Sequence, residues 1–193
     1  MGIYLNSRQL ADRARRELYK GSEKSASVEN LHESFAFDEA IGDYDLFLSH
    51  RYADKDAVAG LALMLRDDYH LNVYVDWQCD NFNRSNVTRD TARIIRERIT
   101  QSKALLYVIS DSSESSNWMP WEVGFMDGLK GKVAVCPLLA SDDNIKAIGL
   151  EYLSLYPYVS NEEDKRGNLR LWVNETNSKY WLLSDWVNGK LSR

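Results

Sequence analysis

The chain lacks the features that mark several broad classes of protein. Its 193 residues carry a net charge of −5, whereas a nucleic-acid-binding protein normally shows an excess of basic residues on one face. No apolar run approaches the ~20 residues that a membrane-spanning helix needs. The start of the chain becomes polar too early for a signal peptide. Ser7 falls one place too late for the myristoylation pattern that follows Met-Gly. We therefore expect a cytoplasmic protein with neither a membrane nor a nucleic acid as partner.

Cysteine is also scarce, and the common cofactor signatures are missing. Cys79 and Cys136 form neither a CxxC pair nor a metal-ligand spacing, so reduced thiols explain them most simply. The sequence contains no GxxxxGK[ST] phosphate loop and no HExxH helix. Three glycines, Gly124, Gly128 and Gly131, have the wrong spacing for a dinucleotide fingerprint. These absences point away from a metal or a prosthetic group.

What the chain does have is a regular alternation of apolar strands and amphipathic helices. Strands are predicted at 44–50, 72–77, 103–110 and 132–139, and helices at 54–69, 88–102 and after residue 117. Strands that are apolar throughout are typical of a sheet covered by helices on both faces. The pattern therefore predicts an α/β protein with a flavodoxin-like, open parallel sheet of about five strands. Pro137 fits the end of a strand or an edge strand.

The two ends of the chain are less regular. Residues 6–20 are predicted to form a basic helix with a thin apolar stripe, and 21–42 a linker. We therefore divide the chain into an N-terminal helix with linker (1–42) and a main domain (43–193). In the tail, strands are expected near 152–159 and 169–175, and a closing helix over 178–189.

Polar residues gather where the predicted strands end. Ligands of open α/β sheets bind outside the carboxyl ends of the strands. This rule directs attention to Ser49, His50 and Arg51, to Asp76 and the loop after it, and to Ser110. A Ser49-His50-Asp76 triad is not favoured, because neighbouring residues on a strand point to opposite faces.

The stretch "SSNWMPWEVGFMDG" (115–128) reads as the start of a helix that carries a single carboxylate among aromatic residues. Ser116 or Asn117 can cap this helix, and Pro120 is tolerated in its first turn. Trp118 and Glu122 are four residues apart and share a face. Spacing alone leaves two hypotheses for Glu122. It either stabilises the positive end of the helix dipole or acts as a catalytic group in the cleft.

The remaining apolar residues of this helix are expected to face the core. Trp121 and Phe125 form one pair, and Met126 and Leu129 continue an apolar stripe.

Four segments in order, "YDLFLSH", "VYVDW", "KALLYVIS" and "SSNWMPWE", resemble a TIR (Toll/interleukin-1 receptor) domain, as does "VAVCPLL" further on. The resemblance covers about residues 43–140. Enzymatic members of this family cleave NAD⁺ and carry a Trp-x-x-x-Glu motif, which Trp118 and Glu122 match. Asp76 matches the aspartate before the family's BB loop. The chain has His50 where many relatives have Tyr, and its loop lacks their glycine.

The resemblance assigns roles to the residues at the strand ends. It implies that Glu122 is the catalytic residue and that NAD⁺ is the substrate, with no prosthetic group. The residues implied to bind NAD⁺ are Ser49, His50, Arg51, Asp76, Phe82, Ser110 and Trp118. One carboxylate is sufficient, because nicotinamide leaves as a neutral pyridine and needs no proton donor, unlike the leaving group of a glycosidase.

The function implied is that of a stand-alone, prokaryotic-type TIR NADase or ADP-ribosyl cyclase. Such a chain is similar to the TIR subunits of anti-phage, Thoeris-like systems, which make a nucleotide signal for a separate effector protein. Self-association through TIR–TIR contacts is a further expectation from the resemblance. Two alternatives remain: a non-enzymatic TIR adaptor, including the virulence type, and an enzyme resembling a nucleoside 2-deoxyribosyltransferase.

Overall fold

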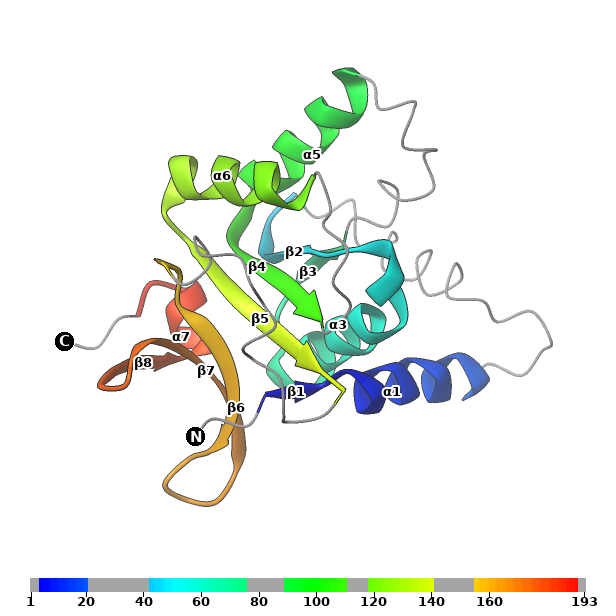
Figure 1. Cartoon of the computed structure of the whole chain (residues 1–193), viewed down its shortest axis with the longest axis vertical. Coiled ribbons are helices and arrows are strands. Elements are labelled where there is room, and N and C mark those ends of the chain that lie inside the picture. The colour runs from blue at the N-terminus through cyan, green and yellow to red at the C-terminus, as the bar shows by residue number, and fades with distance from the viewer. Residues whose placement is uncertain (1–3, 21–41, 76–88, 111–117, 141–154, 191–193) are drawn as a thin grey trace.

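One sheet of eight strands organises the part of the chain that the structure describes (Figure 1). This computed structural model describes residues 4–20, 42–75, 89–110, 118–140 and 155–190. The strands lie in the order β3 (Val73–Val75), β2 (Tyr44–Ser49), β4 (Ser102–Ser110), β5 (Val133–Leu139), β6 (Tyr158–Glu163), β7 (Leu169–Thr176) and β8 (Lys179–Leu182). The short strand β1 (Leu5–Asn6) pairs with β5 beyond this path.

The first part of the sheet is parallel and has the flavodoxin-like strand order. From β3 to β6 every neighbouring pair is parallel, and β2, the first of these strands in the chain, lies between β3 and β4. Every residue of β5 is buried, as expected for a parallel strand with helices over both faces. The predicted fold class is therefore confirmed. The strands predicted at 44–50, 103–110 and 132–139 match β2, β4 and β5 to within one residue.

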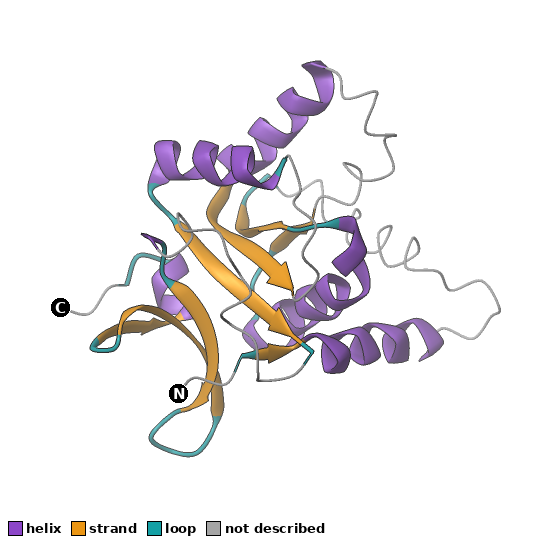
Figure 2. Cartoon of the chain, viewed as in Figure 1, coloured by secondary structure: helices purple, strands orange, loops and turns teal. Residues whose placement is uncertain are grey.

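Helices cover both faces of this sheet (Figure 2). Helices α1 (Ser7–Lys20) and α3 (Lys55–Tyr69) cover one face, and α5 (Arg89–Gln101) and α6 (Met119–Lys130) cover the other. Side chains alternate along β2 between these layers. Leu46 and Leu48 belong to the core beneath α1 and α3, whereas Phe47 belongs to the core beneath α5 and α6. A one-turn helix, η2 (Tyr52–Asp54), leads from β2 into α3.

The N-terminal helix α1 packs directly on α3. Leu10 and Ala14 are buried in the core that α1 shares with α3. The two helices approach so closely that a Cβ atom on Gly60 would lie 1.9 Å from the carbonyl oxygen of Leu10. Glycine is therefore required at position 60 by the space available between two backbones. Strand β1 continues this attachment, since Leu5 pairs with Leu138 in parallel register.

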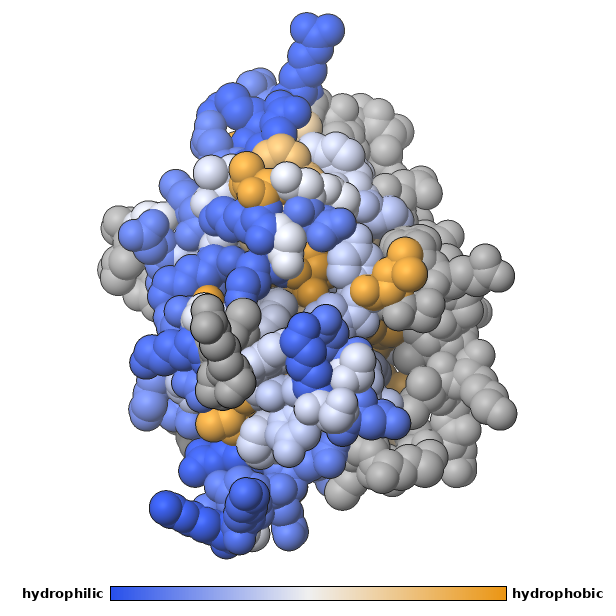
Figure 3. Space-filling view, turned by 90° about the vertical axis from the view of Figure 1, so that its left-hand side faces the viewer, coloured by the Kyte–Doolittle hydropathy of each residue, from blue (hydrophilic) through white to orange (hydrophobic). Residues whose placement is uncertain are grey.

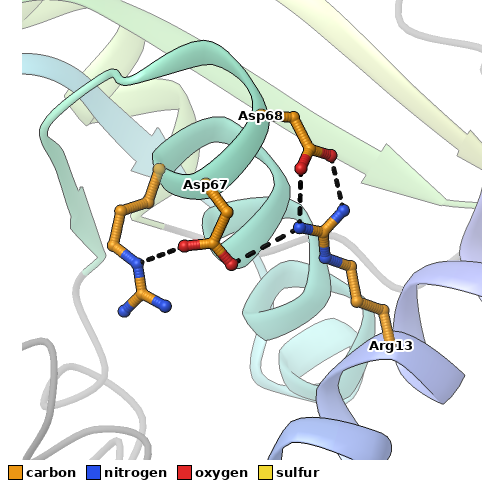
Figure 4. A network of polar contacts seen from close by, with 4 residues as sticks. Arg13, Asp67 and Asp68 are labelled. Atoms are coloured by element: carbon orange, nitrogen blue, oxygen red, sulfur yellow. Dashed lines mark hydrogen bonds and ion pairs between the residues drawn. The ribbon is translucent and has the colours of Figure 1, made fainter.

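An ion-pair network fixes the outer side of the same helix pair (Figure 4). The Arg13 guanidinium donates two hydrogen bonds to Asp68, at 2.6 and 3.0 Å, and a third to Asp67 at 3.4 Å. A hydrogen bond from Arg66, supported by Arg13, lowers the pKa of Asp67. These groups are partly exposed, so the network orients α1 more than it stabilises the fold.

The end of the chain corrects one prediction. The segment expected to form a helix over 178–189 forms strand β8, followed by the short helix α7 (Leu183–Val187). Strands β6, β7 and β8 are antiparallel, and a two-residue turn joins β7 to β8. The helical spacing of Tyr180, Leu183 and Val187 was misleading, because Tyr180 packs across the hairpin against Trp172, with ring centroids 5.5 Å apart.

Smaller differences concern single positions. Strand β6 begins only at Tyr158, later than the strand expected over 152–159. Pro137 lies near the end of β5, which is a central strand of the sheet. Leu129 is exposed and does not continue the apolar stripe of α6. The predicted linker 21–42 lies almost wholly outside the described residues. The loop that follows Asp76 lies outside them, as do Ser116 and Asn117. The prediction that one of these two residues caps α6 is wrong, because the N-cap residue is Trp118, which makes no side-chain capping hydrogen bond.

Exposed apolar side chains are scattered over the surface. The largest exposed fraction among them is 81%, at Leu155. On the face shown in Figure 3, apolar residues form small separate patches among polar ones. Scattered apolar residues are normal on a protein surface. None of the helices in the described ranges is long and apolar enough to span a membrane.

Candidate active site

A buried carboxylate and a buried hydroxyl meet at the carboxyl end of β2. The Ser49 hydroxyl, on the last residue of β2, donates a hydrogen bond to Oε2 of Glu122 on α6. Ser49 is 1% exposed and Glu122 is 4% exposed. The structure thus joins two residues that are 73 positions apart in the chain, and both belong to the predicted site. Charged side chains are seldom buried unless a partner satisfies them, so this pair is unusual in the core.

The start of α6 places Glu122 one turn inside the helix. The Glu122 N–H donates to the carbonyl oxygen of Trp118 at 3.0 Å, which closes the first turn. Pro120 lies in that turn, where its missing N–H leaves no bond unmade. The helix ends at Lys130. The C-cap residue Gly131 has a φ of 58°, and its N–H donates to the carbonyl oxygen of Asp127 at 2.8 Å. An acid in the first turn is favoured by the helix dipole, which offsets part of the cost of burying Glu122.

Three aromatic rings lie next to one another on α6. The rings of Trp118 and Trp121 meet edge to face with centroids 5.4 Å apart. Trp121 and Phe125 stack with centroids 6.0 Å apart. All three rings are partly buried and pack against the core beneath α5 and α6, so the core-facing position predicted for Trp121 and Phe125 is confirmed in this form.

Arg51 connects the ends of two neighbouring strands. Its guanidinium donates to Oδ2 of Asp54 from Nε at 3.2 Å and from Nη2 at 3.0 Å. Nη2 also donates to the hydroxyl of Ser110, the last residue of β4, at 2.6 Å. Strands β2 and β4 flank the point where the strand order reverses, which is where ligands of this fold class bind. A largely buried cation at this point suits a diphosphate.

His50 turns away from the carboxylate. Its Nδ1 lies 3.2 Å from the carbonyl oxygen of Leu48, on the same strand. Ser49 faces α6 and Glu122 instead, as the alternation of side chains along a strand requires. The structure therefore supports the argument against a triad built on Ser49 and His50.

Six of the eight residues predicted for the site lie in described parts of the chain: Ser49, His50, Arg51, Ser110, Trp118 and Glu122. Direct contacts join Ser49 to Glu122 and Arg51 to Ser110. Asp76 and Phe82 lie outside the described residues.

The sequence reasoning missed Asp54, the partner of Arg51. The three-residue spacing of an acid after Arg51 was a signal that could have identified it. The described ranges contain no group of three or more His, Cys, Asp or Glu side chains placed to hold a metal ion.

Comparison with known proteins gives results that agree with this geometry. Residues 47–135 match the family description of the Thoeris protein ThsB, TIR-like domain. A protein of Bacillus cereus (strain MSX-D12), named as a probable 3' cyclic ADP-D-ribose synthase, ThsB', is 36% identical over 176 residues. That match covers 88% of each chain. A protein of Cytobacillus dafuensis, named as a candidate cyclic ADP-D-ribose synthase, TIR2, is 30% identical over 101 residues. This second match covers 51% of the present chain and 26% of the relative.

Proposed function

This chain belongs to the Thoeris ThsB family of TIR-like proteins, and we propose that it cleaves the nicotinamide–ribose bond of NAD⁺ and makes a cyclic ADP-ribose signal. The observation that carries the proposal is the buried Glu122, held by Ser49 at the carboxyl end of β2. A carboxylate buried in this way gains little for stability, so a chemical role accounts for it better than a structural one. The names of both relatives support the same activity for this chain.

The chemistry needs one anionic group close to the reacting sugar. The C–N bond breaks, and its electron pair leaves with nicotinamide as a neutral ring. The ribose carbon that remains resembles an oxocarbenium ion. Glu122 in its ionised form would stabilise this cation and accept hydrogen bonds from the ribose hydroxyls. At ~4 Å and an effective dielectric constant near 20, such a charge pair is worth about 4 kcal/mol as an upper guide.

The neighbouring groups would bind the rest of the substrate. Arg51 would contact the diphosphate, since a guanidinium forms strong, charge-assisted hydrogen bonds with phosphate oxygens. Trp118 would close the site beside Glu122 and offer an aromatic face. Asp76 and Phe82 keep their predicted roles in binding the nucleotide.

The acceptor decides the product. Water would give ADP-ribose and release one proton. A ribose hydroxyl of the same substrate molecule would close a ring and also release a proton, whereas a ring nitrogen of adenine would close a ring without doing so. The Bacillus cereus relative, which matches along most of its length, is named for the 3' cyclic isomer. We therefore propose that this isomer is the main product. A separate effector protein would sense it, and self-association would complete the site.

The decisive experiment identifies the product and its dependence on Glu122. Purified protein is incubated with NAD⁺, with and without a crowding agent, and nicotinamide and all ADP-ribose species are separated and identified by mass spectrometry. We expect nicotinamide and a cyclic product in equal amounts, and both at a rate roughly 1,000-fold lower from Glu122→Gln. A matched control is Glu97→Gln on α5, an exposed carboxylate that pairs with Arg93, which should keep full activity.

Three outcomes would contradict all or part of the proposal. Nicotinamide release that is the same in Glu122→Gln as in the wild type would remove Glu122 from the chemistry. Complete absence of nicotinamide under every condition would favour a TIR adaptor. Nicotinamide released together with linear ADP-ribose alone would keep the cleavage step and overturn the cyclase assignment.

A further inference from the structure

The hydroxyl of Ser49 is already engaged by the protein, which changes the role that the sequence suggested for it. We infer that Ser49 is a positioning residue that acts on the substrate through Glu122 rather than by touching NAD⁺ itself. The inference rests on the proposed function, because it concerns the same carboxylate. Its support is the donated hydrogen bond from the Ser49 hydroxyl to Oε2 of Glu122, within a pair of side chains that are both almost fully buried.

Ser49 lies at a buried position of a paired strand, so its hydroxyl has a fixed place in the fold. Ser49 follows Phe47, a residue of the core beneath α5 and α6, in the row of β2 side chains that faces α6. The backbone of Ser49 is fixed by pairing with Tyr107 on β4. A rigid strand therefore holds the hydroxyl at the level of Glu122, which α6 brings to it from above the sheet.

The hydrogen bond has a direct consequence for the charge of Glu122. Burial alone favours the neutral form of a carboxyl group, whereas a hydrogen bond donated to the carboxylate favours the charged form. The proposed chemistry requires the charged form. Ser49 would thus keep the buried group ionised and hold it in one rotamer, which are two requirements of a preorganised site.

Other ionisable groups on the elements around α6 also contribute to the electrostatic potential at Glu122. On the segment after β2 they are His50 and the ion pair of Arg51 with Asp54. On β4 the group is Tyr107, which lies in the core beneath α5 and α6. Helix α5 brings Arg98, which lies over the Tyr74 ring at 5.6 Å, and α6 itself brings Asp127 one turn beyond Glu122. Cys136 on β5 lies in the core of the opposite face.

The test combines two substitutions and the pH dependence of kcat/KM. Ser49→Ala removes the donor, and Ser49→Thr keeps a hydroxyl at the same position. In Ser49→Ala we expect kcat/KM on the acid side of the profile to fall by up to about 10-fold. We expect the acid limb of the profile to move upward by about one pH unit, with activity returning at higher pH. Ser49→Thr should keep the limb of the wild type. Adding Ser49→Ala to Glu122→Gln should cause no further loss, because Ser49 acts only through the carboxylate.

The contrary results are equally specific. An unchanged acid limb in Ser49→Ala, together with a raised KM, would show that Ser49 contacts the substrate directly. An unchanged limb with a lowered kcat and a lowered Tm would reduce Ser49 to a structural residue. A further loss of activity in the double variant, beyond that of Glu122→Gln, would also overturn the inference.

One measurement separates this inference from the proposed function. The carboxyl group of Glu122 can be titrated by ¹³C NMR in protein labelled at glutamate, and assigned as the signal that Glu122→Gln lacks. Ser49→Ala should raise its pKa whether or not the protein turns over NAD⁺. An unchanged pKa in Ser49→Ala would refute the inference even in an active enzyme. A raised pKa of Glu122 in Ser49→Ala, together with no nicotinamide release by the wild type, would refute the proposed function but support the contact between Ser49 and Glu122.

Discussion

The two faces of the sheet use the same strands but differ in what they bury. The face beneath α1 and α3 is lined almost entirely by Leu, Val and Ala side chains. The face beneath α5 and α6 is richer in aromatic side chains, and at the end of β2 it holds a carboxylate and a hydroxyl. Among the described residues, the one buried carboxylate is Glu122, which lies on the second face.

The difference shows that the burial which stabilises the fold and the buried charge which the site requires lie on different faces of the sheet. Burial of apolar surface contributes roughly 25 cal/mol per Å² to stability. The face beneath α1 and α3, called here the aliphatic face, gains this contribution without the cost of desolvating a charge. The face with Glu122 gives up part of that gain, because a buried carboxylate is costly even when it accepts hydrogen bonds. Natural proteins keep such local losses mainly where function requires them. A substitution on the face with Glu122 should therefore lower activity much more than stability, and a substitution on the other face should lower stability more than activity.

The largest effect is expected from Glu122→Gln, on the polar face. Removing the negative charge should lower the rate of nicotinamide release by roughly 1,000-fold, which corresponds to about 4 kcal/mol of lost transition-state stabilisation. The Tm should stay the same or rise, because a buried charge has been replaced by a neutral group of the same shape. Release assays and thermal unfolding of one sample check both parts. A large fall in Tm would mean that Glu122 serves the fold.

The reverse profile is expected from Gly60→Ala, on the aliphatic face. The new Cβ would overlap the carbonyl oxygen of Leu10, so α1 must move away from α3. We expect a loss of about 2 kcal/mol or more in the free energy of unfolding, and a Tm lower by about 4 °C or more. Differential scanning calorimetry measures the shift.

Gly128→Ala on α6 is the matched control for Gly60→Ala. A Cβ atom at this exposed helical position meets nothing within 4 Å. The substitution should stabilise the protein by about 0.5–1 kcal/mol, because alanine is the better helix former. Equal effects of the two substitutions would contradict the close approach of α1 and α3.

A smaller effect on activity is expected from the cation at the end of β2. Arg51→Ala should raise KM for NAD⁺ about 10-fold with a smaller change in kcat, since the lost contacts bind the diphosphate in ground state and transition state alike. Steady-state kinetics give both constants. The double variant with Asp54→Asn avoids a buried, unpaired carboxylate and should show the same rise in KM. The control is Arg93→Ala, at an exposed position of α5. An equal KM in Arg51→Ala and Arg93→Ala would remove Arg51 from the binding site.

The smallest effect is a pH dependence that arises on the aliphatic face. Complete burial raises the pKa of the Cys136 thiol to about 12, above its ordinary value of 9.0. Because the folded protein holds this proton more tightly than the unfolded chain, the contribution of Cys136 to stability is complete below pH 9. It is lost as pH rises from 9 towards 12, at about 1.4 kcal/mol per pH unit.

Urea unfolding between pH 7 and pH 10 tests this dependence. Cys136→Ala should be less stable than the wild type at pH 7, and the difference should shrink above pH 9. The comparison of the two proteins cancels other groups that titrate in the same range. A constant difference would mean that the thiol ionises equally easily in both states.

The sequence alone predicted the structure well where a local pattern fits one kind of element only. The apolar runs of β2, β4 and β5 predicted a sheet with both faces covered, and the structure has this sheet. The order of the motifs predicted the family, which the comparisons confirm. The prediction of one helix over 178–189 was wrong, because the aromatic residues there fit a helix and a hairpin equally well. The turn between β7 and β8 distinguishes the two structures.

The candidate site divides in the same way. Local periodicity was enough to predict which residues lie at the carboxyl ends of the strands and that Trp118 and Glu122 lie one helix turn apart. Three contacts could be found only in the folded protein: the Ser49 hydroxyl donates to Glu122, Arg51 donates to Ser110, and Gly60 leaves room for α1. Those contacts join residues that are tens of positions apart. They depend on the packing of helices against the sheet, which no local pattern encodes.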